Sequence, residues 1–253
     1  MRAFALSVIS LVSVAGCAVA TEGPGESSVE QAALVHVDRH DSTTTLAARY
    51  VRGSKLDVEA LRASGGLFEL PEIDQCIAFS HLGEGRGEAG RSIELVAAGT
   101  TLVTQGERVV ELSPRSIPDV SDVVSGVVYS KSVALEPGAA LVQLAGTEPL
   151  TVEIPTDLED LELPSLEGDN DVVLRWRAGG GALVVVDVHS VSAGSFRCAM
   201  RDSGSASLER AMFGNDGTVV VRRLAHFEAE REAFQRVLVF AEASRTLAYK
   251  VAR

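Results

Sequence analysis

Three side chains with metal-binding chemistry lie two positions apart in the first part of the chain. His36, Asp38 and His40 alternate with Val35 and Val37, so a β-strand places all three on one face. Imidazole and carboxylate groups are ligands of Zn²⁺ and other divalent ions. The same alternation is typical of a strand with one solvated face. The pattern favours the solvated face and leaves a metal site as the alternative.

A second group of acidic side chains lies in residues 155–171, which read PTDLEDLELPSLEGDND. Within it, Glu167, Asp169 and Asp171 offer oxygen ligands of the kind that Ca²⁺ binds. The EF-hand spacing is absent, and so many carboxylates in one segment mainly repel one another and stay hydrated. The composition therefore predicts an acidic interdomain linker, with a calcium site as the alternative.

Motifs for nucleotide binding and catalysis are weak. Residues 85–90 read GRGEAG, but β-like residues follow where a dinucleotide fingerprint requires a helix. His189 and His226 could act as bases, yet the sequence contains neither G-x-S-x-G nor H-E-x-x-H. We therefore predict a non-enzymatic protein without a cofactor. The alternative is a hydrolase or a metal-dependent enzyme built on a β-sandwich scaffold.

The chain begins with a pattern of protein export. Arg2 precedes an apolar run that is too short to cross a bilayer as a helix, and Ala15 and Gly16 stand directly before Cys17. This pattern resembles the lipobox of bacterial lipoproteins. The resemblance implies that residues 1–16 are a signal peptide and that acyl chains such as palmitate are attached to Cys17. The alternative is an ordinary signal peptide that is cut near residues 18–20.

The resemblance also implies a location in the cell. The residue after Cys17 is Ala18 and not aspartate, which in such families favours the outer membrane, facing the periplasm or the cell surface. Three acyl chains hold a protein far more firmly than one. Residues 17–30 are rich in Gly, Pro, Ser and Glu, which predicts a flexible tether.

Two further cysteines, Cys76 and Cys198, remain as an even pair in the oxidising compartment that export implies. A disulfide between them would join the N-terminal half of the chain to the C-terminal half. Two separate buried thiols would fit the pattern as well. Sequence alone leaves both open, because the geometry of a disulfide cannot be deduced from spacing.

Composition excludes some partners. The chain has 253 residues and a net charge of −12. Nucleic-acid binding requires a basic surface, and electrostatic adhesion to anionic lipid requires positive charge as well. We therefore expect no nucleic-acid partner, and membrane attachment only through the N-terminal lipid.

Short apolar runs with period-two alternation recur along the chain and are separated by glycine-containing turns. They predict an all-β protein of two β-sandwich domains, at residues 31–154 and 172–253. Around residues 172–200, alternation places Trp176 and Cys198 in the core. About seven short strands after residue 171 match the count of an immunoglobulin-like sandwich. A short helix at residues 56–64 and a helical turn at 228–233 interrupt the predicted strands.

The run from Trp176 to Phe-x-Cys-x-Met-x-Asp-Ser-Gly at residues 196–204 resembles domains of uncharacterised envelope lipoproteins of myxobacteria and their relatives. Residues 73–76 (IDQC) and 135–138 (LEPG) are similar to the N-terminal half of these proteins. The resemblance implies a binding or structural module of the cell envelope. Its partner, a protein or a polysaccharide, is left open.

Overall fold

The computed structural model describes residues 29–40, 43–53, 56, 70–78, 94–117, 126–164, 166, 168, 170–179, 183–231 and 233–251. The predicted all-β fold is confirmed: the described residues form sixteen β-strands and one 3₁₀ turn, η1 (Arg210–Met212). No helix among these residues is long and apolar enough to cross a membrane. Cys17, the GRGEAG loop, Glu167 and Asp169 lie outside the described residues.

The strands of the N-terminal half are β1 (Glu30–His40), β2 (Thr43–Gly53), β3 (Gln75–Ala78), β4 (Glu94–Leu95), β5 (Leu102–Gln105), β6 (Arg108–Glu111), β7 (Ser113–Ile117), β8 (Gly126–Val133), β9 (Gly138–Gln143) and β10 (Leu150–Ile154). Those of the C-terminal half are β11 (Val172–Arg175), β12 (Leu183–Ser190), β13 (Gly194–Arg201), β14 (Ser205–Leu208), β15 (Asp216–Arg231) and β16 (Phe234–Lys250).

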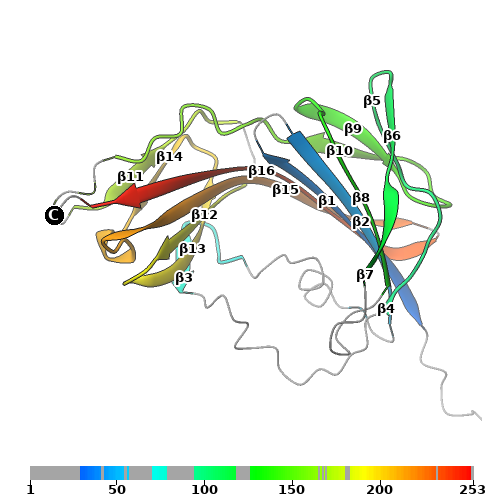
Figure 1. Ribbon diagram of the computed structural model, residues 1–253, viewed down its shortest axis with the longest axis horizontal. Helices are drawn as coiled ribbons and strands as arrows, with labels where there is room; N and C mark the ends of the chain where they lie inside the picture. Colours follow the sequence, from blue (N-terminus) through cyan, green and yellow to red (C-terminus); the bar gives the residue numbers. More distant parts are fainter. Residues whose placement is uncertain are drawn as a thin grey trace, which may run out of the picture.

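One large sheet dominates the molecule. It has nine strands in the order β13-β12-β15-β16-β1-β2-β8-β7, with β4 paired to β2. Figure 1 shows that its long strands bend into an arch. Two smaller sheets, β10-β9-β5-β6 and β11-β14, lie on the convex side of this arch. Because strands alternate their side chains between two faces, the large sheet presents one set to these sheets and the other to its concave face.

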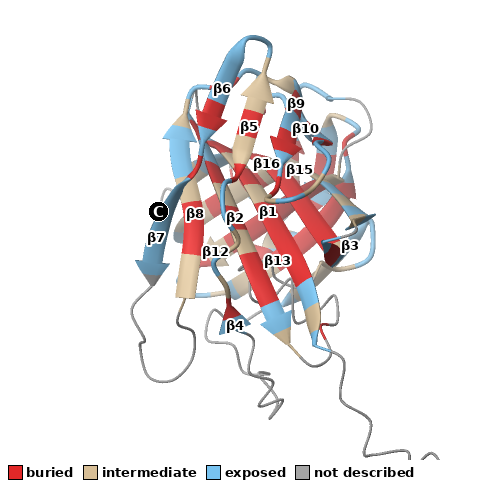
Figure 2. Cartoon of the chain, turned by 90° about the vertical axis from the view of Figure 1, so that its right-hand side faces the viewer, coloured by how far each residue is buried: buried red, intermediate tan, exposed pale blue. Residues whose placement is uncertain are grey.

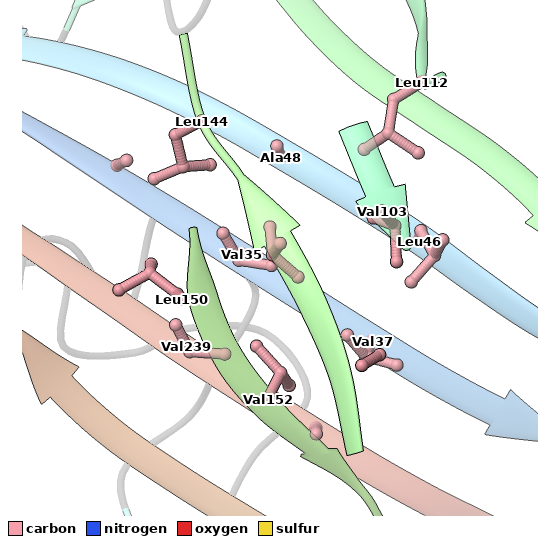
Figure 3. Packing of buried hydrophobic residues seen from close by; sticks show 14 of the residues in the cluster. Val35, Val37, Leu46, Ala48, Val103, Leu112, Leu144, Leu150, Val152 and Val239 are labelled. Atoms are coloured by element: carbon pink, nitrogen blue, oxygen red, sulfur yellow. The ribbon is translucent and has the colours of Figure 1, made fainter. Parts of the chain in front are cut away.

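Two apolar cores fill the space between the large sheet and the smaller ones. The first lies under the four-stranded sheet, where Val35, Val37 and Val239 of the large sheet meet Val103 and Val152 (Figure 3). The second lies under β11 and β14 and includes Trp176 and Cys198, as alternation predicts. In Figure 2 the buried residues form bands through the central strands. Each fully buried aliphatic side chain contributes roughly 1.5–3 kcal/mol.

The large sheet joins the two halves of the chain. β1 and β16 are parallel neighbours, paired from Ala32 and Arg236 to His40 and Ser244. The two predicted domains are therefore not connected by a linker alone, because their strands share one sheet and β16 of the C-terminal half contributes Val237 and Val239 to the first core. After residue 171 the described residues form six strands, four of which belong to the large sheet. The domain boundaries themselves stay a prediction.

Of the two arrangements that the sequence left open for the cysteines, the structure has the disulfide. Cys76 on β3 and Cys198 on β13 are bonded and lie 122 positions apart in sequence. The backbone N–H of Asp74 also donates to Ala199 O at 2.7 Å, and Ile73 forms a parallel bridge with the same residue. The segment around β3 therefore covers the outer edge of the large sheet at β13.

The described part of the acidic segment at residues 155–171 packs against the second core. Leu158, Leu161 and Leu166 are buried there. These leucines recur every three to five positions between the acids. The segment therefore packs its leucines inward, while most of its described carboxylates are exposed and Asp157 is half-buried.

The prediction of a helical turn at residues 228–233 is wrong. β15 continues through Glu228 to Arg231 and turns directly into β16. Phe227 and Ala229 pack against the first core while Glu228 and Glu230 are exposed, so the period is two and not 3.6. β16 likewise runs without a break from Phe234 to Lys250. The predicted helix at 56–64 lies outside the described residues apart from Leu56.

Candidate functional site

Charged side chains cross the concave face of the large sheet from β13 to β1. Alternation explains their common orientation, because each sits one position from a side chain that enters the convex cores. We call this group the polar belt, and its members are Arg197, Asp187, Arg222, Glu242, His36 and Asp38. Beside it lies an apolar cluster on the same face that includes Leu34, Leu238 and Phe240.

Asp187 lies near one end of the polar belt, between two arginines. Arg197 donates to it from Nε at 2.7 Å and from Nη2 at 2.9 Å, and Arg222 donates from Nη1. The side chain of Asp187 is only 1% exposed. Burial by itself raises the pKa of this carboxyl, but the hydrogen bonds and charges of the two arginines outweigh it and lower the pKa overall. Asp187 is thus held as a carboxylate.

Glu242 continues the polar belt toward the centre of the sheet. Its Oε2 lies 3.7 Å from Nε of Arg222, and its Oε1 lies 3.2 Å from Nε2 of His36. Arg222 therefore stands between two carboxylates, one on β12 and one on β16. Charges alternate in sign along this row, which makes each pair favourable at a partly buried site.

Asp38 interrupts the alternation of charge. It is the register partner of Glu242 across the β1–β16 junction, so two carboxylates are neighbours. Its Oδ1 atom is buried, and no described residue donates a hydrogen bond to it. Burial raises the pKa of Asp38, and the charge of Glu242 raises it further, against the opposing effects of His36, His40 and Arg222. Asp38 is the least stabilised charge of the polar belt.

The metal sites that the sequence left as alternatives are not seen among the residues that the structure describes, and Glu167 and Asp169 of the calcium alternative lie outside those residues. No three of their His, Cys, Asp or Glu side chains come together as a metal-binding group. His36, Asp38 and His40 do share a face, but successive residues on one face of a strand are about 6.6 Å apart. His36 contacts Glu242 instead. Asp171, from the predicted calcium site, accepts a hydrogen bond from Ser207 Oγ at 3.5 Å.

The two histidines considered as bases have different surroundings. Nδ1 of His189 lies 3.3 Å from Oγ of Ser195 on the neighbouring strand β13. The carboxylate on the same face, Asp187, is bound by Arg197 and Arg222. His226 is exposed on β15, and its ring stacks on Phe240 with centroids 6.1 Å apart.

Alternation alone could not reveal a second polar network, on the convex side of the sheet. Arg223 is 2% exposed and lies between the two cores. Its guanidinium donates to Asp202 at 2.8 Å and to the carbonyls of Thr156 and Asp157 at 2.9 Å. Asp202 also accepts from Trp176 Nε1 at 2.7 Å. The only signal in the sequence is an arginine at a core-facing position of an apolar strand.

Arg39 makes a similar connection from β1. Its Nε and Nη2 donate to the two carboxylate oxygens of Asp157 at 2.8 and 3.0 Å. Its Nη1 donates to the carbonyl of Leu135. Arg39 and Arg223 thus fix the residues after β10 to the large sheet, which explains why this acidic segment is ordered against the cores. Both arginines therefore have a structural role.

Comparison of the chain with models of known protein families and with curated proteins finds no match.

Proposed function

We propose that this chain is a non-enzymatic lipoprotein of the bacterial outer membrane, anchored through Cys17, that serves as a binding or structural module of the cell envelope. The observation that carries the proposal is the disulfide between Cys76 and Cys198. Disulfides of this kind persist in oxidising compartments such as the periplasm and the cell surface. The disulfide also accounts for two of the three cysteines, which leaves Cys17 for the lipid.

The arrangement of the large sheet supports a binding role over a catalytic one. The charges at one end of the polar belt are bound to one another, since Asp187 is held by Arg197 and Arg222. A general base requires a pKa near the working pH, whereas the pKa of Asp187 is lowered. Charged groups that are bound to one another in this way fit a binding or structural module better than an active site. The partner is a protein or a polysaccharide.

Metabolic labelling tests the anchor. Cells that express the wild-type chain are grown with radiolabelled palmitate, and label is measured in the immunoprecipitated protein. We expect incorporation in the wild type and none in Cys17→Ser. The variant Ala20→Ser, which changes a neighbouring residue and keeps the thiol, is the matched control and should be labelled. Absence of label from the wild type, or equal label in Cys17→Ser, would refute the anchor.

Capture of partners tests the binding role. The wild-type chain, with an affinity tag at its C-terminus, is purified from envelope extracts at low salt, and co-purified proteins and glycans are identified by mass spectrometry. A partner that the wild type retains, and that is lost when residues of the polar belt are substituted, supports a binding module. Turnover of envelope ester, amide or glycoside substrates by the purified protein would favour the hydrolase instead.

A further inference from the structure

β15 extends well beyond the strand that flanks it. β12 pairs with β15 from Ser190 and Gly217 to Leu183 and Leu224, and there it ends. From Ala225 to Arg231, β15 pairs with β16 on its other side and with no other strand of the described residues. Its residues are buried or half-buried from Gly217 to Leu224 and alternate between half-buried and exposed after it. This change is typical of a sheet edge.

A pocket opens beside this edge. It has a volume of about 510 Å³, and its apolar lining comes from Leu183, Leu224 and Ala225 on the large sheet and from Ile154 and Pro155 at the end of β10. Gly179 and the polar residues Glu153, Thr156, Arg223 and His226 complete the lining. The volume is within the range of pockets that bind small ligands or single side chains of a partner. The apolar part of the lining can contact an apolar side chain.

The edge next to the pocket carries acidic side chains. Glu228 and Glu230 are exposed on the face of β15 that also bears His226, and Glu153 is exposed on β10. Glu228 lies 3.5 Å from Arg236, with both side chains well exposed. The pocket is lined from both faces of β15, since Leu224 and His226 share the face of Glu228 and Glu230 while Ala225 belongs to the other face.

We propose that this edge binds an extended basic segment of a partner protein, which adds to β15 as a strand in line with β12. In such addition, main-chain hydrogen bonds supply affinity and alternate side chains supply specificity. A segment with basic and apolar residues matches the edge, because its basic side chains would meet Glu228 and Glu230 and an apolar side chain would enter the pocket at the Leu224 end. This proposal rests on the proposed binding function and names the chemistry of its partner.

Other edges of the large sheet are less suitable. The segment of Ile73 and Cys76 covers β13, and β7, the strand at the opposite end, contains Pro114, which cannot donate a hydrogen bond. A second copy of this chain is a poor occupant of the β15 edge. Two antiparallel copies would bring the same carboxylates, Glu228 and Glu230, close to each other, which is unfavourable.

Peptide binding to the full chain tests the proposal. The probe is a fluorescein-labelled peptide of three Lys-Val repeats, and fluorescence anisotropy measures its affinity for the detergent-solubilised protein. We expect binding by this peptide, and at least about tenfold weaker binding by a Glu-Val peptide and by a Lys-Val peptide with alternate N-methylated amides, since a tenfold change corresponds to 1.4 kcal/mol. Amide hydrogen exchange should slow at residues 225–230 on binding.

Variants of the protein complete the test. Glu228→Lys combined with Glu230→Lys should weaken binding of the Lys-Val peptide at least about tenfold, because it reverses the charge of the edge. Glu111→Lys, at an exposed position on β6, is the matched control and should bind as the wild type does. Absence of peptide binding, equal binding of the acidic or N-methylated peptide, protection outside residues 225–230, or dimerisation through this edge would overturn the proposal. Palmitate incorporation at Cys17 is measured separately, so failure of either proposal is recognisable.

Discussion

The carboxylate of Asp38 is placed where the large sheet joins the two halves of the chain. Its register partner across the junction is Glu242, so the fold brings together two negative charges that are 204 positions apart in sequence. His36 and Arg222 compensate Glu242, whereas Oδ1 of Asp38 is buried without a donor among the described residues. A buried carboxylate oxygen without a donor lowers the free energy of unfolding. Unfavourable features of this kind are common where a surface serves recognition.

Asp38→Asn should therefore stabilise the protein at neutral pH. The folded-state pKa of Asp38 is raised above the ordinary value of 3.8, so the folded state holds the proton more tightly and stability falls as pH rises through this raised pKa. The amide carries no charge and can donate toward Glu242. We expect a gain of up to about 1 kcal/mol at pH 7, limited by solvent screening, and little difference below pH 3.8. Urea unfolding of the variant and the wild type at pH 7 and below pH 3.8 measures this difference in the free energy of unfolding. A loss of stability of the variant at pH 7 would contradict this account.

Asp187 behaves in the opposite way. Its pKa is lowered in the fold, so its stabilisation is present above the ordinary value of 3.8 and is lost as pH falls through the lowered pKa. Asp187→Asn leaves Arg197 and Arg222 without their common carboxylate and should cost about 3–5 kcal/mol at pH 7. The matched control is Glu94→Gln, which breaks an exposed pair with Arg52 and should cost at most about 1 kcal/mol. Equal losses in the two variants would show that the belt adds no stability.

At the scale of the elements, alternation predicted the strands whose two faces differ in polarity. The alternating residues of β1 and β2 form an antiparallel pair, and Trp176 and Cys198 are buried as expected. Alternation could not predict β7, because Ser113, Pro114 and Arg115 offer no apolar face. It also could not predict which strands pair. The parallel β1–β16 contact joins distant segments, and only the packed fold determines it.

The candidate site was less predictable than the strands. The sequence identified the shared face of His36, Asp38 and His40, but it could not supply their partners on β15 and β16. Arg222 and Glu242 belong to strands with several charged residues, so nothing in their local pattern distinguishes them. Their proximity follows from sheet register, which depends on pairing between strands far apart in sequence.

The disulfide fixes the segment of β3 to the edge strand β13 and encloses a loop of more than a hundred residues. Its loss in Cys76→Ala combined with Cys198→Ala should reduce the free energy of unfolding by about 2–5 kcal/mol, because the unfolded chain gains entropy. Urea unfolding of the wild type with and without dithiothreitol provides the comparison. Reductant should destabilise the wild type and leave the double variant unchanged. If the oxidised wild type and the double variant unfold at the same urea concentration, the bond does not stabilise the fold.

At the scale of the whole molecule, the shared sheet makes the two halves depend on each other. Residues 29–154 and 155–253, produced as separate chains, should each lack a cooperative thermal transition. In the second fragment, Val237, Val239 and Ala241 of β16 lose their neighbour β1. Mixing the fragments should restore the transition and the near-ultraviolet signal of Trp176. Cooperative unfolding of either fragment alone would instead support two independent domains.

The central claim, that the chain is an exported protein held by lipid at Cys17, is tested most directly by the mass of its N-terminal peptide. Trypsin releases residues 17–39 from the mature protein purified from outer membranes, since Arg39 is the first cleavage site after Cys17. We predict a peptide that begins at Cys17 and carries the mass of a diacylglyceryl group and an amide-linked acyl chain. A peptide that begins elsewhere, or that has an unmodified Cys17 thiol, would contradict the claim.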